Sequence, residues 1–333
     1  MNPLLKKILL ASAAAIAALA LAIAAINLLS SETDEESPSP SASPSLTRSG
    51  MTGTIQVVAT TNVWASVVEI IGGDWVEVTP IIDNIAQDPH SYEASARDQL
   101  AVQDAELVIA NGGGYDEFME QLVAASEGEK LFIELVEGSH DHVDDGEAET
   151  DAETVSEHDH ENEHIWYDLH QVTEAAEVIA AAITELRPEA FDEINQNYDF
   201  FVSELENLEL RVEALRDRAL GLGAIAVEGV GNLMLEDAGF NILTPQDLAD
   251  AIEEERDVPL TALEETRALI KNKLVVLLVV NTQVDDAVSD ELITIAESVG
   301  IPVVALSELI PSQDMDYLDW MAQVIDGLQE AIY

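Results

Sequence analysis

The chain has 333 residues, of which 66 are acidic, 13 are lysine or arginine and none is cysteine. A formal net charge of −53 repels nucleic acid and anionic lipid, so neither is expected as a partner of the folded part. The absence of cysteine excludes disulfides, thiolate metal ligands and a cysteine nucleophile. Such acidity mainly favours solubility or salt tolerance, and it also concentrates cations around the protein.

The N-terminus has the pattern of an export signal. Lys6 and Lys7 precede an almost unbroken run of alanine, leucine and isoleucine from Ile8 to Leu29. Because about twenty apolar residues also suffice to span a bilayer, we expect residues 1–30 to be a signal peptide or an N-terminal membrane anchor. Residues 31–51 are rich in serine, proline and acidic residues and are expected to form a disordered linker.

These features predict an exported protein at the outer face of the cytoplasmic membrane. The lysines before the apolar run place the rest of the chain outside the cytoplasm, whether the protein stays anchored by the N-terminal helix or is secreted after cleavage. The stretch Ala25 to Leu29 contains no cysteine that could accept a lipid. We therefore expect that the protein is not a lipoprotein.

From residue 52 onward, short β-branched runs alternate with longer helical patterns. In the first block the expected strands are 55–60, 76–82, 107–111 and 130–135, and the expected helices are 62–71, 94–104 and 115–126. In the second block the expected strands are 224–228, 274–281 and 301–306, and the expected helices are 260–272, 285–299 and 314–332. This alternation predicts parallel sheets flanked by helices, in an N-terminal α/β lobe at 52–187 and a C-terminal α/β lobe at 221–333.

A long helix is expected between the two blocks. Residues 188–220 keep a helical period without a breaker, beginning at a proline suited to the first turn of a helix. At 1.5 Å per residue such a helix is roughly 45–50 Å long, which is too long for a crossover inside one lobe. No strict heptad runs through it, so a rigid helix joining the lobes is favoured over a coiled coil.

Residues 138–163 form an insert in the first lobe that is rich in aspartate, glutamate and histidine. Its composition cannot bury enough apolar surface to fold alone. Two His-x-His pairs lie within it, His140 with His142 and His158 with His160. The insert is either an auxiliary metal-binding loop or a solvated loop whose histidines have no role.

The other histidines are His90, His164 and His170. His90 follows a strand and precedes a helix, which is the loop position where α/β proteins place ligand groups. His164 also lies just before a helix. His170 falls on that helix and is expected at the surface.

Several short strings together resemble one protein family. They are TTNVW at 60–64, GGD at 72–74, DPHSYE at 88–93, NGGGYD at 111–116, HIWYD at 164–168 and YLDWM at 317–321. In order and spacing they are similar to the cluster-A solute-binding proteins of zinc and manganese ABC importers, from about Ile55 to the C-terminus. The resemblance implies two (β/α) lobes with parallel sheets, joined by one long rigid helix, with a metal site in the cleft between the lobes.

The resemblance also implies the metal ligands. His90 and His164 fall on the histidine positions of the first lobe, and Glu228 and Glu308 fall on the ligand positions of the second. Two neutral imidazoles and two carboxylates give zero net charge with a divalent cation bound. Around Glu228 the sequence departs from the family, because Gly229 to Asn232 replaces an aromatic-containing run.

Ligands of this kind need supporting groups, because a histidine bound to a metal usually donates its other N–H to a carboxylate or carbonyl. The nearby polar residues are Asp88, Glu93, Asp168 and Asn281. Asp168 can equally be the N-cap of the next helix.

The expected function is therefore capture of a divalent metal, Zn²⁺ favoured over Mn²⁺, and its delivery to a membrane permease of an ABC importer with its cytoplasmic ATPase. We expect a monomer and no enzymatic activity. A metal-binding surface adhesin or a metal chaperone on the same fold is the alternative, and a zinc hydrolase is disfavoured because no His-Glu-x-x-His string occurs. The triple glycine at 112–114 is expected to be a structural turn, not a phosphate-binding loop.

Overall fold

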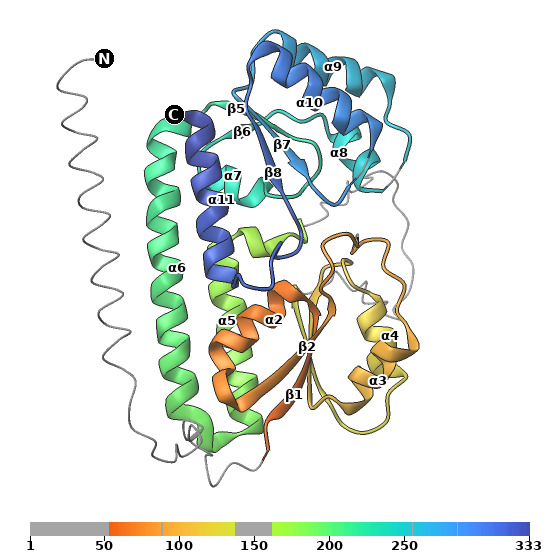
Figure 1. Ribbon diagram of the computed structural model, residues 1–333, viewed down its shortest axis with the longest axis vertical. Helices are drawn as coiled ribbons and strands as arrows, with labels where there is room; N and C mark the ends of the chain where they lie inside the picture. Colours follow the sequence, from red (N-terminus) through yellow and green to blue (C-terminus); the bar gives the residue numbers. More distant parts are fainter. Residues whose placement is uncertain (1–52, 88, 137–161, 255, 285) are drawn as a thin grey trace, which may run out of the picture. The chain divides into compact units, whose positions relative to one another are not determined.

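The computed structural model describes residues 53–87, 89–136, 162–254, 256–284 and 286–333 (Figure 1). The expected export segment at 1–30 and the linker at 31–51 lie outside these residues. The same is true of Asp88 and of the insert histidines His140, His142, His158 and His160. Within the described ranges, no helix combines the length and the apolar character needed to cross a membrane.

The first lobe is built on a parallel sheet with strand order β2-β1-β3-β4. Its strands are β1 (Ile55–Thr61), β2 (Val76–Ile82), β3 (Leu107–Gly112) and β4 (Leu131–Val136). Strands β1 and β3 are buried almost throughout, because helices cover both faces of the sheet, and this accounts for their continuous apolar runs. The helices are α2 (Asn62–Gly72), α3 (Ala96–Asp104) and α4 (Phe118–Ala124), with α2 on one face and the other two on the opposite face (Figure 1).

The second lobe repeats the plan with the parallel order β6-β5-β7-β8. Its strands are β5 (Gly223–Ala226), β6 (Asn241–Ile242), β7 (Leu277–Asn281) and β8 (Val303–Leu306). Its helices are α7 (Asn232–Asp237), α8 (Gln246–Glu253), α9 (Leu260–Lys271) and α10 (Ala287–Val299). The expectation of parallel sheets in two α/β lobes is confirmed. Strand β6 and helices α7 and α8 were not predicted from the sequence, because each is too short to show a clear period.

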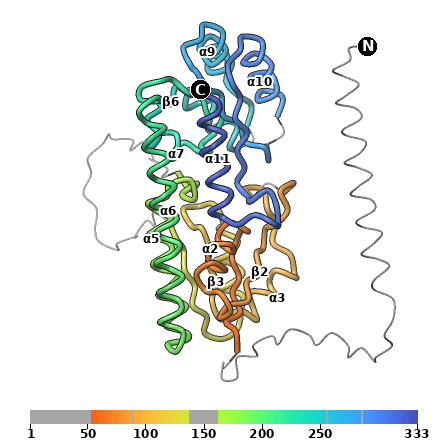
Figure 2. The backbone as a smooth tube through the Cα atoms, turned by 60° about the vertical axis from the view of Figure 1, so that its left-hand side comes forward, coloured from red at the N-terminus to blue at the C-terminus, as the bar shows by residue number. Residues whose placement is uncertain are grey.

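The long helix is also confirmed. It follows α5 (Leu169–Leu186) and a 3₁₀ turn at Pro188–Ala190, and α6 then runs for 29 residues from Phe191 to Ala219 (Figure 2). At 1.5 Å per residue this is about 44 Å. Its buried residues recur at helical spacing along one stripe, which is the stripe that packs on its neighbours. They are Ile194, Phe201, Leu205, Leu208, Val212, Leu215 and Ala219.

After β8 the chain returns to the first lobe before it forms the last helix, α11 (Tyr317–Ile332). Asn62 donates to the carbonyl of Ile310 at 2.9 Å and accepts from the N–H of Ile310 at 3.0 Å. The hydroxyl of Tyr317 donates to the carbonyl of Trp166 at 2.7 Å, and Leu309 is part of the first lobe's apolar core. The segment that begins with Ser307 and Glu308 is thus held by β8 of the second sheet on one side and by these contacts with the first lobe on the other. The residue limits assigned above to the lobes and the linking helix stay a prediction.

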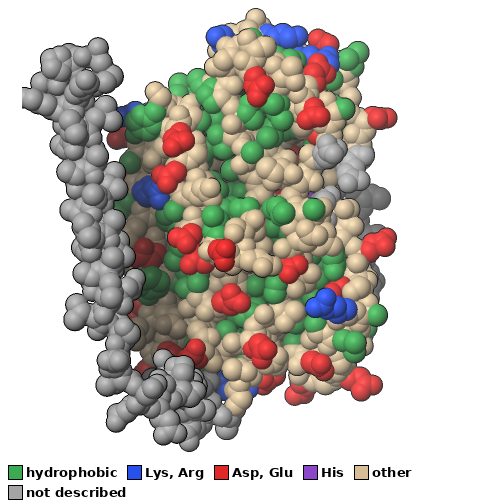
Figure 3. Space-filling model, in the orientation of Figure 1, with side chains coloured by type: hydrophobic (Ala, Val, Ile, Leu, Met, Phe, Trp, Pro, Cys, Tyr) green, Lys and Arg blue, Asp and Glu red, His purple; other side chains and the backbone are tan. Residues whose placement is uncertain are grey.

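Acidic side chains are spread over the visible face of the molecule (Figure 3). They are not gathered in one patch there, and few lysine or arginine side chains lie among them. This distribution fits a general adaptation of the surface better than one acidic docking patch.

The triple glycine closes a turn around a buried carboxylate, as expected for a structural turn. Asp116 is 3% exposed and accepts hydrogen bonds from Thr60 Oγ1 at 2.5 Å, Asn111 N at 2.6 Å and Gly112 N at 2.8 Å. Burial raises the pKa of Asp116, against the opposing effect of these donors. Gly112 has a φ of +82°, and a Cβ there would lie 2.2 Å from the carbonyl oxygen of Val136.

We predict that Gly112→Ala destabilises the protein more than Gly128→Ala does. Both positions have positive φ, where a Cβ costs about 1–2 kcal/mol, but a Cβ at Gly128 meets nothing within 4 Å. The additional clash with Val136 should lower the free energy of unfolding by at least about 1 kcal/mol beyond the control. Urea unfolding of the two variants measures the difference, and equal losses would contradict the packing described here.

Candidate metal site

The four residues expected to bind the metal are positioned by short segments that follow or precede regular elements. His90 lies between β2 and α3, and His164 immediately precedes the 3₁₀ turn Ile165–Tyr167. Glu228 and Glu308 lie two residues beyond the ends of β5 and β8, at the carboxyl edge of the second sheet. Three of them are almost completely buried, with exposures of 1% for His164, 4% for Glu228 and 1% for Glu308.

Glu308 joins groups from both lobes. Its Oε2 lies 3.4 Å from Nε2 of His90 and accepts a hydrogen bond from the hydroxyl of Tyr115 at 3.0 Å. Its Oε1 accepts from Nδ2 of Asn281, at the end of β7, at 2.7 Å. Asn281 is one of the polar residues that the sequence indicated as supporting groups, and it contacts Glu308 directly. Each oxygen of this buried carboxylate therefore has a fixed hydrogen-bond donor. Oε2 can still accept a further bond on the side that faces His90.

The electrostatic balance keeps Glu308 ionised. Burial by itself raises the pKa of a carboxyl group, but the hydrogen bond from His90, the charges that His164 and His90 can carry and the Tyr115 hydroxyl together hold the pKa of Glu308 below its usual value. The backbone around Glu308 is fixed as well, because the hydroxyl of Tyr167 donates to the carbonyl of Ser307 at 2.7 Å.

The two imidazoles face one another with ring centroids 5.8 Å apart. Tyr115 packs its ring edge-on against both, at 5.1 Å from His90 and 6.3 Å from His164. Trp166 lies behind His164 at 5.2 Å. The side chain of His90 is 24% exposed, so it forms the solvent side of the site while His164 forms the interior.

Asn162 determines which nitrogen of His164 can bind a metal. Its Oδ1 accepts from the backbone N–H of His164 at 2.9 Å and contacts Nδ1 of the same residue at 2.8 Å. Because an amide oxygen only accepts, Nδ1 must carry the proton, and Nε2 is left with its lone pair. Nε2 is buried and has no hydrogen-bond partner among the residues that the structure describes. A buried lone pair fixed in this way is suited to bind a metal ion.

Asn162 also connects the lobes, since its Nδ2 donates to the carbonyl of Gly229 at 2.9 Å. A Cβ at Gly229 would lie 3.6 Å from Nδ1 of His164 and 3.7 Å from an oxygen of Glu253. The segment after Glu228 therefore approaches the first lobe closely, where the family has an aromatic-containing run.

We predict that the neutral imidazole of His164 in the metal-free protein is the Nδ1-protonated tautomer, because Nδ1 faces Asn162 Oδ1 at 2.8 Å. Burial lowers its pKa from the usual value, against the opposing charges of Glu308 and Glu163, whereas an unfolded histidine titrates near about 6.5. The unfolded state therefore takes up the proton first, and this residue's contribution to stability is lost as pH falls from about 6.5 toward the lower, folded pKa.

Long-range ¹H–¹⁵N correlation spectra distinguish the tautomers directly. Assignment by a His164→Gln variant identifies the signal, and Asn162→Ala should allow both tautomers to appear. A neutral His164 that carries its proton on Nε2 in the wild-type protein would contradict the assignment.

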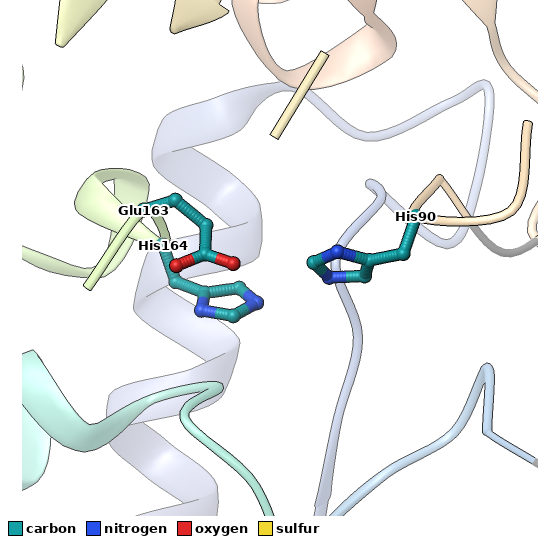
Figure 4. A group of neighbouring side chains, drawn as sticks. All are labelled: His90, Glu163 and His164. Carbon is teal, nitrogen blue, oxygen red and sulfur yellow. The ribbon is translucent and has the colours of Figure 1, made fainter. Parts of the chain in front are cut away.

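One carboxylate at the site was not predicted. An oxygen of Glu163 and ring nitrogens of His90 and His164 all lie within 4.8 Å of one another, and Figure 4 shows the carboxylate directed into the space between the rings. Sequence reasoning missed Glu163 and Asn162 because both were counted in the low-complexity insert at 138–163. The available signal was their position directly before His164.

Glu253, at the end of α8, is the second carboxyl group that the sequence did not indicate. Burial raises its pKa to about 8, with further contributions from the charge of Glu163 and a hydrogen bond to the Glu163 side chain. His90 and Glu228 also act on it electrostatically, so Glu253 belongs to the same neighbourhood from the side of the second lobe.

The remaining predicted supporting residues lie elsewhere. Asp168 is the N-cap of α5, accepting from the N–H groups of His170 at 2.9 Å and Gln171 at 3.1 Å, which confirms the alternative reading of that residue. Glu93 is exposed. His170 is exposed on α5, as expected, with its side chain 80% accessible.

Facing imidazoles and carboxylates between two parallel-sheet lobes linked by a long helix define a metal-type solute-binding protein. The pattern of the ZnuA family, described as "Zinc-uptake complex component A periplasmic", matches residues 57–331. The chain belongs to this family, whose members are metal-binding solute-binding proteins of ABC importers and not enzymes.

Curated relatives are consistent with the family. The manganese-binding lipoprotein MntA of Halalkalibacterium halodurans is 28% identical over 155 residues, which are 46% of this chain and 47% of that protein. The iron ABC transporter substrate-binding lipoprotein MtsA of Streptococcus pyogenes is 25% identical over 51% of this chain and 54% of its own. The chain thus spans about half the length of these relatives. The lipoprotein SloC of Streptococcus mutans is 24% identical over 75% of this chain and 79% of its own.

Solved structures share the fold. A crystal structure of ZnuA has a TM-score of 0.65 at 20% identity and covers 84% of this chain and 98% of its own. The periplasmic zinc-binding protein TroA from Treponema pallidum has a TM-score of 0.65 at 18% identity, covering 84% and 99% respectively.

The comparisons correct one expectation about location. Several curated relatives are named lipoproteins, so the prediction that this protein is not a lipoprotein is wrong, whereas export is supported. That prediction rested on the absence of a cysteine that could accept a lipid.

Proposed function

We propose that this protein captures a divalent transition metal outside the cytoplasm and delivers it to the permease of an ABC importer, which its cytoplasmic ATPase drives. The observation that carries the proposal is the buried, unpartnered Nε2 of His164, fixed by Asn162 and facing His90. An imidazole lone pair removed from water and from all described donors is stabilised when a cation binds it.

The proposed ligands are His90, His164, Glu228 and Glu308. The near-complete burial of His164, Glu228 and Glu308, and the 3.4 Å between Glu308 and His90, support the set. Two imidazoles and two carboxylates neutralise a divalent charge, which is needed where the surroundings are as dry as they are around His164 and Glu308. Tyr115 and Asn281 fix the orientation of Glu308.

Zn²⁺ is the favoured cargo. Four nitrogen and oxygen ligands suit its tetrahedral preference, and a given site of this kind binds Zn²⁺ more tightly than Mn²⁺. Mn²⁺ is the second candidate, because carboxylate oxygens dominate the neighbourhood and the relative MntA is named manganese-binding.

Because the proposed ligands come from both lobes, the affinity for the metal depends on the arrangement of the two lobes. Glu308 contacts Tyr115 across the cleft, and Asn162 contacts Gly229. Metal binding at these residues would therefore stabilise one arrangement of the lobes, and a permease that recognises that arrangement can distinguish loaded from empty protein.

We predict that the full-length, metal-stripped protein binds one equivalent of Zn²⁺ tightly and that His164→Ala weakens binding by at least about 100-fold, since a ligand and its buried position are lost together. His90→Ala should have a similar effect. His170→Ala is the matched control, because this side chain is 80% accessible and pairs with Glu174 at the surface. Isothermal titration with Zn²⁺ and Mn²⁺ measures all four proteins.

Tight binding that survives both His90→Ala and His164→Ala would contradict the proposed site. A deletion of residues 138–163 would remove Asn162 and Glu163 together with the insert, so deletion of 138–160 is the appropriate test of the insert. Loss of all tight binding in that deletion alone would assign the metal to the insert.

A further inference from the structure

We propose that Glu163 is a selectivity-determining ligand, a further carboxylate at the metal site that improves binding of Mn²⁺ relative to Zn²⁺. The inference rests on the proposed function and adds a residue to its site. An oxygen of Glu163 and the ring nitrogens of His90 and His164 lie within 4.8 Å of one another.

This distance is close to coordination. Two ligand atoms that each lie about 2.0–2.2 Å from one ion are themselves at most about 4.4 Å apart, so a small adjustment suffices. A cluster of acidic residues alone would not define a site. Here Nε2 of His164, a residue that is 1% exposed, points into the same space and has no hydrogen-bond partner among the described residues (Figure 4).

The backbone holds Glu163 in place. Its carbonyl accepts from Nδ2 of Asn111 at 3.0 Å and from the N–H of Ile165 at 2.8 Å. Asn111 is fully buried and is itself fixed by Nε1 of Trp64, which donates to its Oδ1 at 3.0 Å. The Glu163 side chain therefore starts from a rigid position beside the imidazoles, as a preorganised ligand requires.

Glu253 holds the carboxylate from the other lobe. The Glu253 side chain lies beside that of Glu163, close enough for the two to interact. Glu253 is in this arrangement a positioning residue, which directs the Glu163 carboxylate from the end of α8.

The expected selectivity follows from coordination chemistry. Zn²⁺ is satisfied by four ligands in a tetrahedron, and a further oxygen adds little to its binding. Mn²⁺ prefers more oxygen ligands in an octahedral arrangement, so a fifth protein ligand and an added negative charge benefit it more. Glu163 should thus reduce the ratio of Zn²⁺ affinity to Mn²⁺ affinity, while Zn²⁺ still binds more tightly.

The test is titration of full-length, metal-stripped protein at one fixed pH with Zn²⁺ and with Mn²⁺ separately. Glu163→Gln should weaken Mn²⁺ binding about tenfold to 100-fold and Zn²⁺ binding less than about fivefold, in the range known for groups beside a metal site.

Glu254→Gln is the matched control, because it removes the same charge one residue from Glu253 with a side chain that is 60% exposed. It should leave the ratio of Zn²⁺ to Mn²⁺ affinity unchanged. Glu253→Gln keeps a hydrogen-bonding group opposite Glu163 and should change the ratio less than Glu163→Gln does.

The outcomes separate the two proposals. If the wild type binds neither ion tightly, or His164→Ala binds as the wild type does, the proposed function fails. If the wild type binds and His164→Ala does not, but Glu163→Gln leaves the ratio of Zn²⁺ to Mn²⁺ affinity unchanged, only the role of Glu163 is overturned.

Discussion

The burial of the Glu308 carboxylate is the constraint on which the site depends. A charged group that is 1% exposed is costly unless its oxygens are satisfied, and here the donors come from different parts of the chain. Tyr115 is supplied by the first lobe and Asn281 by the second. The carboxylate can therefore be held in this position only while the two lobes are in contact. The position of this one side chain thus depends on the arrangement of both lobes.

The return of the chain to the first lobe after β8 also helps to fix the position of Glu308. Glu308 lies between the end of a strand in the second sheet and the contacts that Ile310 and Tyr317 make with the first lobe. A loop attached to only one lobe would follow that lobe in any motion. A segment attached to both transmits the position of each lobe to the metal site, and this is the physical basis on which occupancy can be coupled to lobe arrangement.

His164 illustrates how a site can be prepared before its ion arrives. Asn162 fixes the proton on Nδ1, and the aromatic rings of Tyr115 and Trp166 exclude water from the other nitrogen. The imidazole then needs no proton loss or rotation to bind a cation, so less free energy is lost to reorganisation. Carboxylates gather around the same point from both lobes, and the number that reach the ion decides how strongly oxygen-preferring metals can compete with zinc.

The sequence alone determined the two parallel-sheet lobes and the long helix, because continuous apolar strands and a helical period can be recognised without any knowledge of contacts. It also indicated His90, His164, Glu228 and Glu308 as candidate ligands, through short strings that resemble a known family. It also indicated Asn281 at a strand end. It did not indicate Tyr115, Asn162, Glu163 or Glu253, since each acts on a residue that lies in another element or belongs to a stretch whose composition resembles disorder. Only the tertiary structure decided these, because a hydrogen bond to a histidine nitrogen or the approach of α8 to the first lobe depends on distances in space, which residue types and their spacing do not contain.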